Sequence, residues 1–325
     1  MSFRWAIAGL GKVAAGGHHH GIQRNGHTLA GFTTSDPAIR SGDAGHVKFN
    51  WGTSGLTFDV SGLIVSEKPD DAWLRGLRGK ADAVIVCVPT RLHREIVERV
   101  LRAGFDCLVE KPFAETAAEA WELMQLAANL ERKLLVAQVL PAFQEFGALR
   151  AAILQKGLGQ LNSLSLRRLV PWKNVSAKDE IAGSTGYFAD LAVHDAHFLA
   201  SLGHGVVGVH PTRKKYHHER LQYAVVGITL ATYSASVTID VGAKRNCCGD
   251  FEQGFDAVWS DGSMMSFENG EMIVDEKAVA LESQSVGDIF GLEVALAAEH
   301  FRDGKDPGYL APDLAYQALR IIESV

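Results

Sequence analysis

The feature that most constrains this chain is the glycine turn GLGKVA, residues 9–14, which follows an apolar strand-like run and opens a helical segment. A GxGxx(G/A) turn in that context is typical of dinucleotide binding. Gly9 permits the tight turn, Gly11 lets a pyrophosphate approach the main chain, and Ala14 is the small residue at the helix–strand contact. Because a helix N-terminus favours anions, we expect phosphate contacts here. The candidate residues are Gly9, Gly11, Lys12 and Val13.

The segments after this turn alternate between strand and helix patterns. The apolar run ADAVIVCVP and the shorter DCLVEKP read as buried strands, and RLHREIVERVLRAG between them has helical apolar spacing that ends at Gly104. Strands separated by helices of this length indicate βαβ units and a parallel sheet. We therefore predict a Rossmann domain over residues 1–122.

The pattern changes in the remaining part, residues 123–325. YSASVTIDVG alternates apolar and polar residues, which is typical of a half-exposed strand. Asp261-Gly262 and Asn269-Gly270 each separate two apolar runs, which predicts two consecutive hairpins. The second domain is therefore expected to be built on a mainly antiparallel sheet together with helices, and the closing helices could pack back on the first domain. The fold class is α/β throughout.

Composition excludes several function classes. A chain of 325 residues with a formal net charge of −6 suits two globular domains and has no field that would recruit nucleic acid. No apolar run approaches the roughly 20 residues of a membrane span, and no signal segment is recognisable. Four cysteines without CxxC spacing are expected to be thiols with no metal role. We expect a cytoplasmic protein that contacts no membrane.

The end of the second expected strand bears on which nucleotide binds. An acidic residue there usually binds the ribose 2′-hydroxyl, but this chain has Thr33, Thr34 and Ser35, with Asp36 one or two positions late and Arg40 beyond it. Hydroxyls and a nearby arginine suit a 2′-phosphate better, so the sequence favours NADP over NAD. The run from His18 to His20 is expected to contact solvent or a nearby ligand, because successive helical residues point in different directions.

A second cluster of polar residues lies in GYFADLAVHDAHF, residues 186–198. If this segment is helical, Asp190, His194 and His197 fall within about 60° of one another on one face. That spacing fits a zinc site, a proton relay or histidines packed on a helix face. Asp195 lies about 140° away from Asp190, and we expect it to be a solvated charge.

Four motifs follow one another along the chain: GLGKVA, VPTRLH, VEKPFA and GYFADLAVHDAHF. Together they resemble the Gfo/Idh/MocA family of NAD(P)-dependent oxidoreductases, and the likeness covers nearly the whole chain. The resemblance implies a Rossmann domain followed by an α/β domain whose open sheet often forms the oligomer interface. A homo-oligomer, dimer or tetramer, is therefore expected.

The resemblance also implies site residues. The expected catalytic residues are Lys111, Asp190 and His194, and the further cofactor contacts are Pro89, Thr90, His93 and Glu110. It implies that the Lys111–Pro112 bond can be cis, and that hydride passes to the cofactor without a metal. The chain departs from the family at His197, where an aspartate is common, and at residues 138–141, which form a less polar wall. Arg167, Arg168, Trp172 and Lys173 could form a polar rim, an interface or plain surface.

The chemistry of these residues fits hydride transfer at a carbinol carbon. A general base must accept the hydroxyl proton as hydride leaves, and a histidine can do so because its imidazole titrates near neutrality. A lysine beside the oxygen can stabilise developing alkoxide charge, or act as the base if its pKa is lowered. The family resemblance implies that the small molecule on which Lys111 and His194 act is a sugar, cyclitol or related polyol. The alternatives are a non-catalytic regulator of the same fold and a reductase of a non-sugar carbonyl or imine.

Overall fold

The computed structural model describes residues 2–11, 13–37, 40, 61–157, 160–171, 185–203, 205–217, 219–231, 235–244 and 251–325. They form two compact units, Met1–Val139 with Gln284–Pro312, and Leu140–Ser283 with Asp313–Val325. The expected boundary after residue 122 falls inside helix α5 (Ala117–Asn129). The first unit instead continues to Val139 and regains the chain at Gln284, because Leu135, Val294 and Ala297 share its hydrophobic core.

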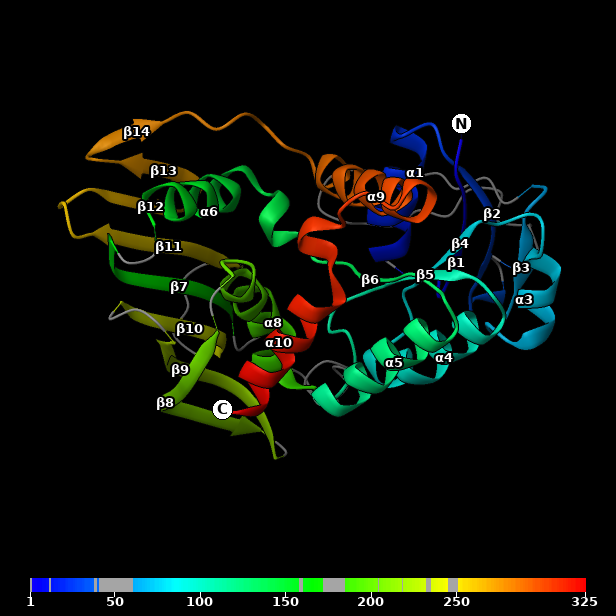
Figure 1. The fold of residues 1–325 in the computed structure, drawn as a ribbon, viewed down its shortest axis with the longest axis horizontal. Coiled ribbons are helices and arrows are strands. Elements are labelled where there is room, and N and C mark those ends of the chain that lie inside the picture. Colours follow the sequence, from blue (N-terminus) through cyan, green and yellow to red (C-terminus); the bar gives the residue numbers. More distant parts are fainter. Residues whose placement is uncertain are drawn as a thin grey trace. The chain divides into compact units, whose positions relative to one another are not determined.

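The first unit has the expected Rossmann architecture. Its six parallel strands are ordered β3-β2-β1-β4-β5-β6. They are β1 (Arg4–Ala8), β2 (Thr28–Thr33), β3 (Ile64–Ser66), β4 (Ala83–Val86), β5 (Asp106–Val109) and β6 (Leu134–Val136). The helical segments are η1 (Ala14–His19), α1 (His20–Arg24), α3 (Asp71–Leu77), η2 (Thr90–Leu92), α4 (His93–Arg102), α5, α9 (Val286–Asp303) and η6 (Gly308–Leu310). Helices α1 and α9 lie side by side on one face of the sheet, and α4 and α5 lie on the other (Figure 1).

Local sequence explains where these elements begin. The strands are apolar on both faces, as a sheet covered on both sides requires, and Trp5, Ile7 and Ile85 are completely buried. The Asp70 carboxylate accepts from the Trp73 amide and caps α3. Ser285 begins α9 with a capping box. Such caps satisfy amides that would otherwise lack a partner in the first turn.

The second unit is built on an eight-stranded sheet ordered β14-β13-β12-β11-β7-β10-β9-β8. Its strands are β7 (Leu161–Pro171), β8 (Val206–His217), β9 (Arg220–Leu230), β10 (Ser236–Lys244), β11 (Glu252–Trp259), β12 (Met264–Glu268), β13 (Glu271–Val274) and β14 (Lys277–Val279). All pairs are antiparallel except β7 with β10. The helical segments are η3 (Leu140–Ala142), α6 (Gln144–Lys156), α8 (Gly186–Ala200) and α10 (Pro312–Glu323). Residues of α6, α8 and α10 share one hydrophobic core with the sheet (Figure 1).

Both predicted hairpins are present in this sheet. The Asp261-Gly262 turn joins β11 to β12, and Asn269-Gly270 joins β12 to β13 with both residues at positive φ. A third hairpin, β13 to β14, turns at Asp275-Glu276, both also at positive φ. Neither residue is a glycine, so the usual turn signal is missing there. Within the described residues, no helix is both long and apolar enough to cross a membrane.

Candidate functional site

The glycine turn has the geometry that a dinucleotide site needs. Gly9 has φ +97°, and a Cβ there would lie 2.9 Å from the main-chain carbonyl of Cys87, so only glycine fits. A Cβ on Gly11 would meet nothing within 4 Å, which leaves the main chain open to a ligand. Lys12 lies outside the described residues, and Val13 is exposed. The described part of the turn therefore fits a bound pyrophosphate.

The hydroxyls at the end of β2 do not have equal roles. The Thr33 hydroxyl accepts a hydrogen bond from the Gly9 amide at 2.9 Å, and its side chain is buried. Thr33 therefore supports the glycine turn from inside, which corrects the expectation of a direct cofactor contact. Ser35 is exposed, and Arg40 donates to the Thr34 carbonyl at 3.0 Å. Ser35 and Arg40 thus remain the candidate nucleotide contacts at this strand end.

The helix after the glycine turn opens with a π-helical segment, η1. Gly17 and Gly21 face α9, where a Cβ would lie 2.8 Å from the Phe290 ring and 2.6 Å from the Phe290 carbonyl oxygen, respectively. The absence of side chains lets α9 pack directly on this segment. His18 and His19 are consequently buried, and His18 has no exposed surface. The expectation of solvent contact is therefore wrong for these two histidines, because α9 covers the face on which they lie.

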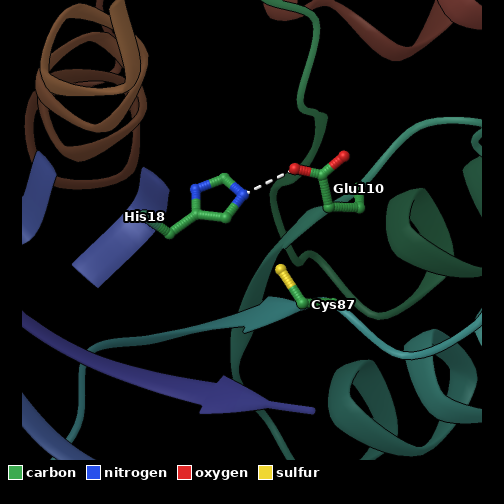
Figure 2. Close-up of side chains that lie close together, drawn as sticks. All are labelled: His18, Cys87 and Glu110. Atoms are coloured by element: carbon green, nitrogen blue, oxygen red, sulfur yellow. Dashed lines mark hydrogen bonds and ion pairs between the residues drawn. The ribbon is translucent and has the colours of Figure 1, made fainter. Parts of the chain in front are cut away.

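The carboxyl ends of β4 and β5 bring three chemically active side chains together. Cys87 directly follows β4, and Glu110 and Lys111 directly follow the neighbouring parallel strand β5. Glu110 accepts from the Lys111 amide at 3.0 Å and lies 2.7 Å from His18 Nε2 (Figure 2). The Lys111–Pro112 peptide bond is cis, as the family resemblance implied. Lys111 therefore lies where parallel sheets usually bind ligands.

His18 connects this strand end to α9. Its Nδ1 lies 3.7 Å from the carboxylate of Glu293, which is completely buried. Burial disfavours a charged imidazole, but Cys87 and Glu110 outweigh it and raise the pKa of His18. Burial raises the pKa of Glu293 to about 8. Sequence reasoning missed Glu293 and Cys87, although a glutamate within the apolar segment GLEVALAAEHF was a usable signal.

His93 has a structural position rather than the expected cofactor contact. It is buried, and its Nδ1 and Nε2 each lie 2.8 Å from a main-chain oxygen, those of Pro112 and Val88. The imidazole thereby joins the loop after β4 to the turn that contains Lys111. Burial lowers the pKa of His93. Pro89 is exposed and Thr90 half-buried, so these two residues remain candidate contacts.

In the second unit, α8 includes the whole 186–198 segment, as predicted. Asp190 and His194 are partly exposed on it, whereas His197 is completely buried. Asp195 is not a solvated charge: its side chain is 1% exposed and accepts two bonds from Arg168, at 3.0 and 3.2 Å. The helix has few exposed positions, so the face opposite Asp190 meets the sheet instead of water.

The pairing of Arg168 with Asp195 also shows which of the two neighbouring arginines of β7 is at the surface. Arg168 is buried and further donates to Gln253 at 2.9 Å, so it is neither a rim nor an interface residue of this unit's surface. Arg167 lies on the opposite face of the sheet beside Asp256 and Glu268. Trp172 and Lys173 lie outside the described residues. A buried arginine between β7 and α8 therefore fixes the helix that carries Asp190 and His194.

Comparison with known proteins agrees with this fold. Residues 3–138 match the model of an oxidoreductase family with an NAD-binding Rossmann fold. The chain is 28% identical to inositol 2-dehydrogenase of Rhizobium meliloti over 56% of each protein. It is 33% identical to UDP-N-acetylglucosamine 3-dehydrogenase of Acidithiobacillus ferrooxidans over 37% of this chain and 35% of that protein. The aligned regions thus span between a third and somewhat over half of these relatives.

The likeness in fold extends further. A crystal structure of the Acidithiobacillus ferrooxidans enzyme covers 100% of this chain and 98% of its own, with a TM-score of 0.74 and 21% identity. The glycine turn, the strand order and the family match define an NAD(P)-binding Rossmann protein with a second, sheet-based domain. Over residues 3–138, the part that the family model matches, the chain is similar to the Gfo/Idh/MocA family of oxidoreductases.

Proposed function

We propose that the protein is an NAD(P)-dependent oxidoreductase that transfers hydride between nicotinamide and a carbinol carbon of a sugar, cyclitol or related polyol. The observation that carries this proposal is the position of Lys111 directly after β5, at the carboxyl edge of the parallel sheet whose β1 leads into the glycine turn, in a chain whose residues 3–138 match an NAD-binding oxidoreductase family. The names of the inositol and UDP-sugar dehydrogenases among its relatives support the substrate class.

Each proposed catalytic residue has a defined task. The dinucleotide, when bound, supplies the hydride acceptor or donor. Lys111 hydrogen-bonds the reacting oxygen and stabilises negative charge on it, or takes its proton as the general base. His194 moves a proton, since an imidazole changes its charge near neutral pH. Asp190, one helical turn before His194, orients polar groups on that face.

A substrate panel separates this proposal from its alternatives. Purified protein is mixed with NAD⁺ or NADP⁺ and with sugars, inositols and amino sugars, and reduced nicotinamide is followed by absorbance. The proposal expects turnover with at least one polyol. Dinucleotide binding without turnover of any compound would indicate the non-catalytic regulator. Reduction confined to an added imine or non-sugar carbonyl would indicate the other enzyme class.

We further propose that the preferred dinucleotide is NADP, with Arg40 and Ser35 contacting the 2′-phosphate. Arg40→Ala is expected to weaken NADPH binding by about 10- to 100-fold, because a hydrogen bond to a charged group contributes about 1.5–3 kcal/mol. NADH binding should change little. Titration of both dinucleotides, followed by nicotinamide fluorescence, measures this difference. Arg78→Ala, at an exposed arginine of the same unit, is the control. Equal losses for NADPH and NADH would refute the preference.

A homo-oligomer formed through the outer face of the second unit's sheet is also proposed. The helices cover the other face, and exposed apolar side chains such as Met264 and Ile273 lie outside the core of this unit. Analytical ultracentrifugation is expected to show a dimer or tetramer, and Ile273→Glu should shift it toward smaller species. A monomer at micromolar concentration would contradict this proposal.

A cytoplasmic location, where thiols stay reduced, is also proposed, and it agrees with the free Cys87 and Cys107.

A further inference from the structure

Side chains with metal-binding groups converge at one place in the described part of the chain. His18 of η1, Cys87 after β4 and Glu110 after β5 each offer one ligand atom, and these atoms lie within 4.8 Å of one another. Figure 2 shows the three side chains directed toward a common centre from separate elements of the first unit. The two strands are parallel neighbours, and α9 holds the histidine segment in place. The rigid fold therefore preorganises the group.

The chemistry of the three donors favours zinc. An imidazole nitrogen, a thiolate sulfur and a carboxylate oxygen are all common ligands of Zn²⁺, whereas Mg²⁺ and Ca²⁺ prefer oxygen alone. Tetrahedral bonds of about 2.0–2.1 Å place nitrogen and oxygen ligands roughly 3.3 Å apart. His18 Nε2 and Glu110 Oε1 are 2.7 Å apart, so a small rotation of either side chain would admit the ion.

The environment of His18 supplies the second observation. A metal-bound histidine usually directs its other ring nitrogen at a carboxylate, which fixes the ring. His18 Nδ1 faces the completely buried Glu293 at 3.7 Å. Neither His18 Nδ1 nor either Glu293 carboxylate oxygen has a hydrogen-bond partner among the described residues. A buried acid that faces this imidazole is what an orienting partner requires.

The cluster can also be reached from outside the unit's core. His18 has no exposed surface, but the Glu110 side chain is 13% exposed and Cys87 is partly exposed. An ion can therefore enter at the carboxyl edge of the sheet. We propose that His18, Cys87 and Glu110 bind one Zn²⁺ ion, with Glu293 orienting His18. This site departs from the expectation that no cysteine has a metal role, and it does not depend on the proposed function.

Cobalt is the probe for this site, because Co²⁺ takes zinc ligands and gives a thiolate charge-transfer band in the near ultraviolet. The full chain, first treated with chelator, is expected to bind one equivalent of Co²⁺ with that band, and Zn²⁺ should displace it. Cys87→Ser should abolish the band. Cys107→Ser and the double variant Cys247→Ser/Cys248→Ser, which cover the other three thiols, should retain it.

A second variant keeps the test informative if Cys87→Ser does not fold. Glu293→Gln leaves all three ligands in place and is expected to weaken Co²⁺ binding about 10- to 100-fold. Circular dichroism verifies the fold of each variant. No stoichiometric Co²⁺ binding by the unmodified chain, or a band unchanged by both variants, would overturn the proposal. No turnover or nucleotide is involved, so failure here is distinct from failure of the proposed function.

Discussion

Lys111→Met is expected to lower kcat/KM for the polyol substrate by about 10²- to 10⁴-fold, the range for loss of an acid–base group or of a charge that stabilises an oxyanion. Lys111 directly follows β5, and its amide is held by Glu110. The methionine has nearly the same length but cannot donate or accept a proton. Most of the effect should therefore appear in kcat, while dinucleotide binding changes little.

Two further variants make the Lys111 result specific. Lys80→Met, at an exposed lysine of the same unit, should leave kcat/KM unchanged. Lys111→Arg retains the charge but has no accessible neutral form. If the lysine only stabilises charge, arginine should restore part of the rate, and if it is the base, arginine should not. A methionine variant that keeps more than about a tenth of the wild-type rate would contradict any catalytic role.

Arg168→Met is expected to lower the free energy of unfolding by about 3–5 kcal/mol, because it leaves the buried Asp195 without its partner. The two side chains are 4% and 1% exposed, and Arg168 also donates to Gln253. Urea titration measures the loss. Arg167→Met is the matched control. Arg167 is the neighbour of Arg168 on β7, and it pairs with Asp256 and Glu268 at the surface, at 3.7 and 3.6 Å. We expect a change below about 1 kcal/mol there.

The loss in Arg168→Met should also depend on pH. Burial raises the pKa of Asp195, while Arg168 lowers it, so removal of the arginine raises that pKa further. The folded variant then keeps a proton that the unfolded chain releases, and its stability falls as pH rises above the unfolded pKa. The variant should therefore be closest to wild type in mild acid. Equal stability of the Arg168 and Arg167 variants at pH 8 would contradict the structural role of the pair.

The sequence predicted the elements that have strong local signals. The glycine turn identified the Rossmann domain, because residues other than glycine rarely adopt the φ of +97° that Gly9 has. The Asp-Gly and Asn-Gly pairs identified two hairpins. The hairpin at Asp275-Glu276 has no such signal. The domain boundary was placed too early because the sequences of α5 and β6 are compatible with either domain. Only the packing of these elements assigns them to the first unit.

The site was less predictable for a physical reason. Spacing along a helix tells which residues share a face, as it did for Asp190 and His194, but not what covers the opposite face. Asp195 was therefore expected in solvent, and His18 in contact with solvent or a ligand, but both are buried by elements distant in sequence, β7 and α9. The contact between His18 and Glu293 joins residues far apart along the chain. No local pattern contains such a contact.

Transfer of deuterium tests the central proposal most directly. The protein is incubated with NADP⁺ and with a polyol that turned over in the substrate panel, deuterated at its carbinol carbons, and the reduced nucleotide is examined by NMR. The proposal predicts deuterium at nicotinamide C4, on one face of the ring, with a rate that falls in Lys111→Met. Reduced nucleotide that carries no deuterium, or labelling at an equal rate in Lys111→Met, would contradict it.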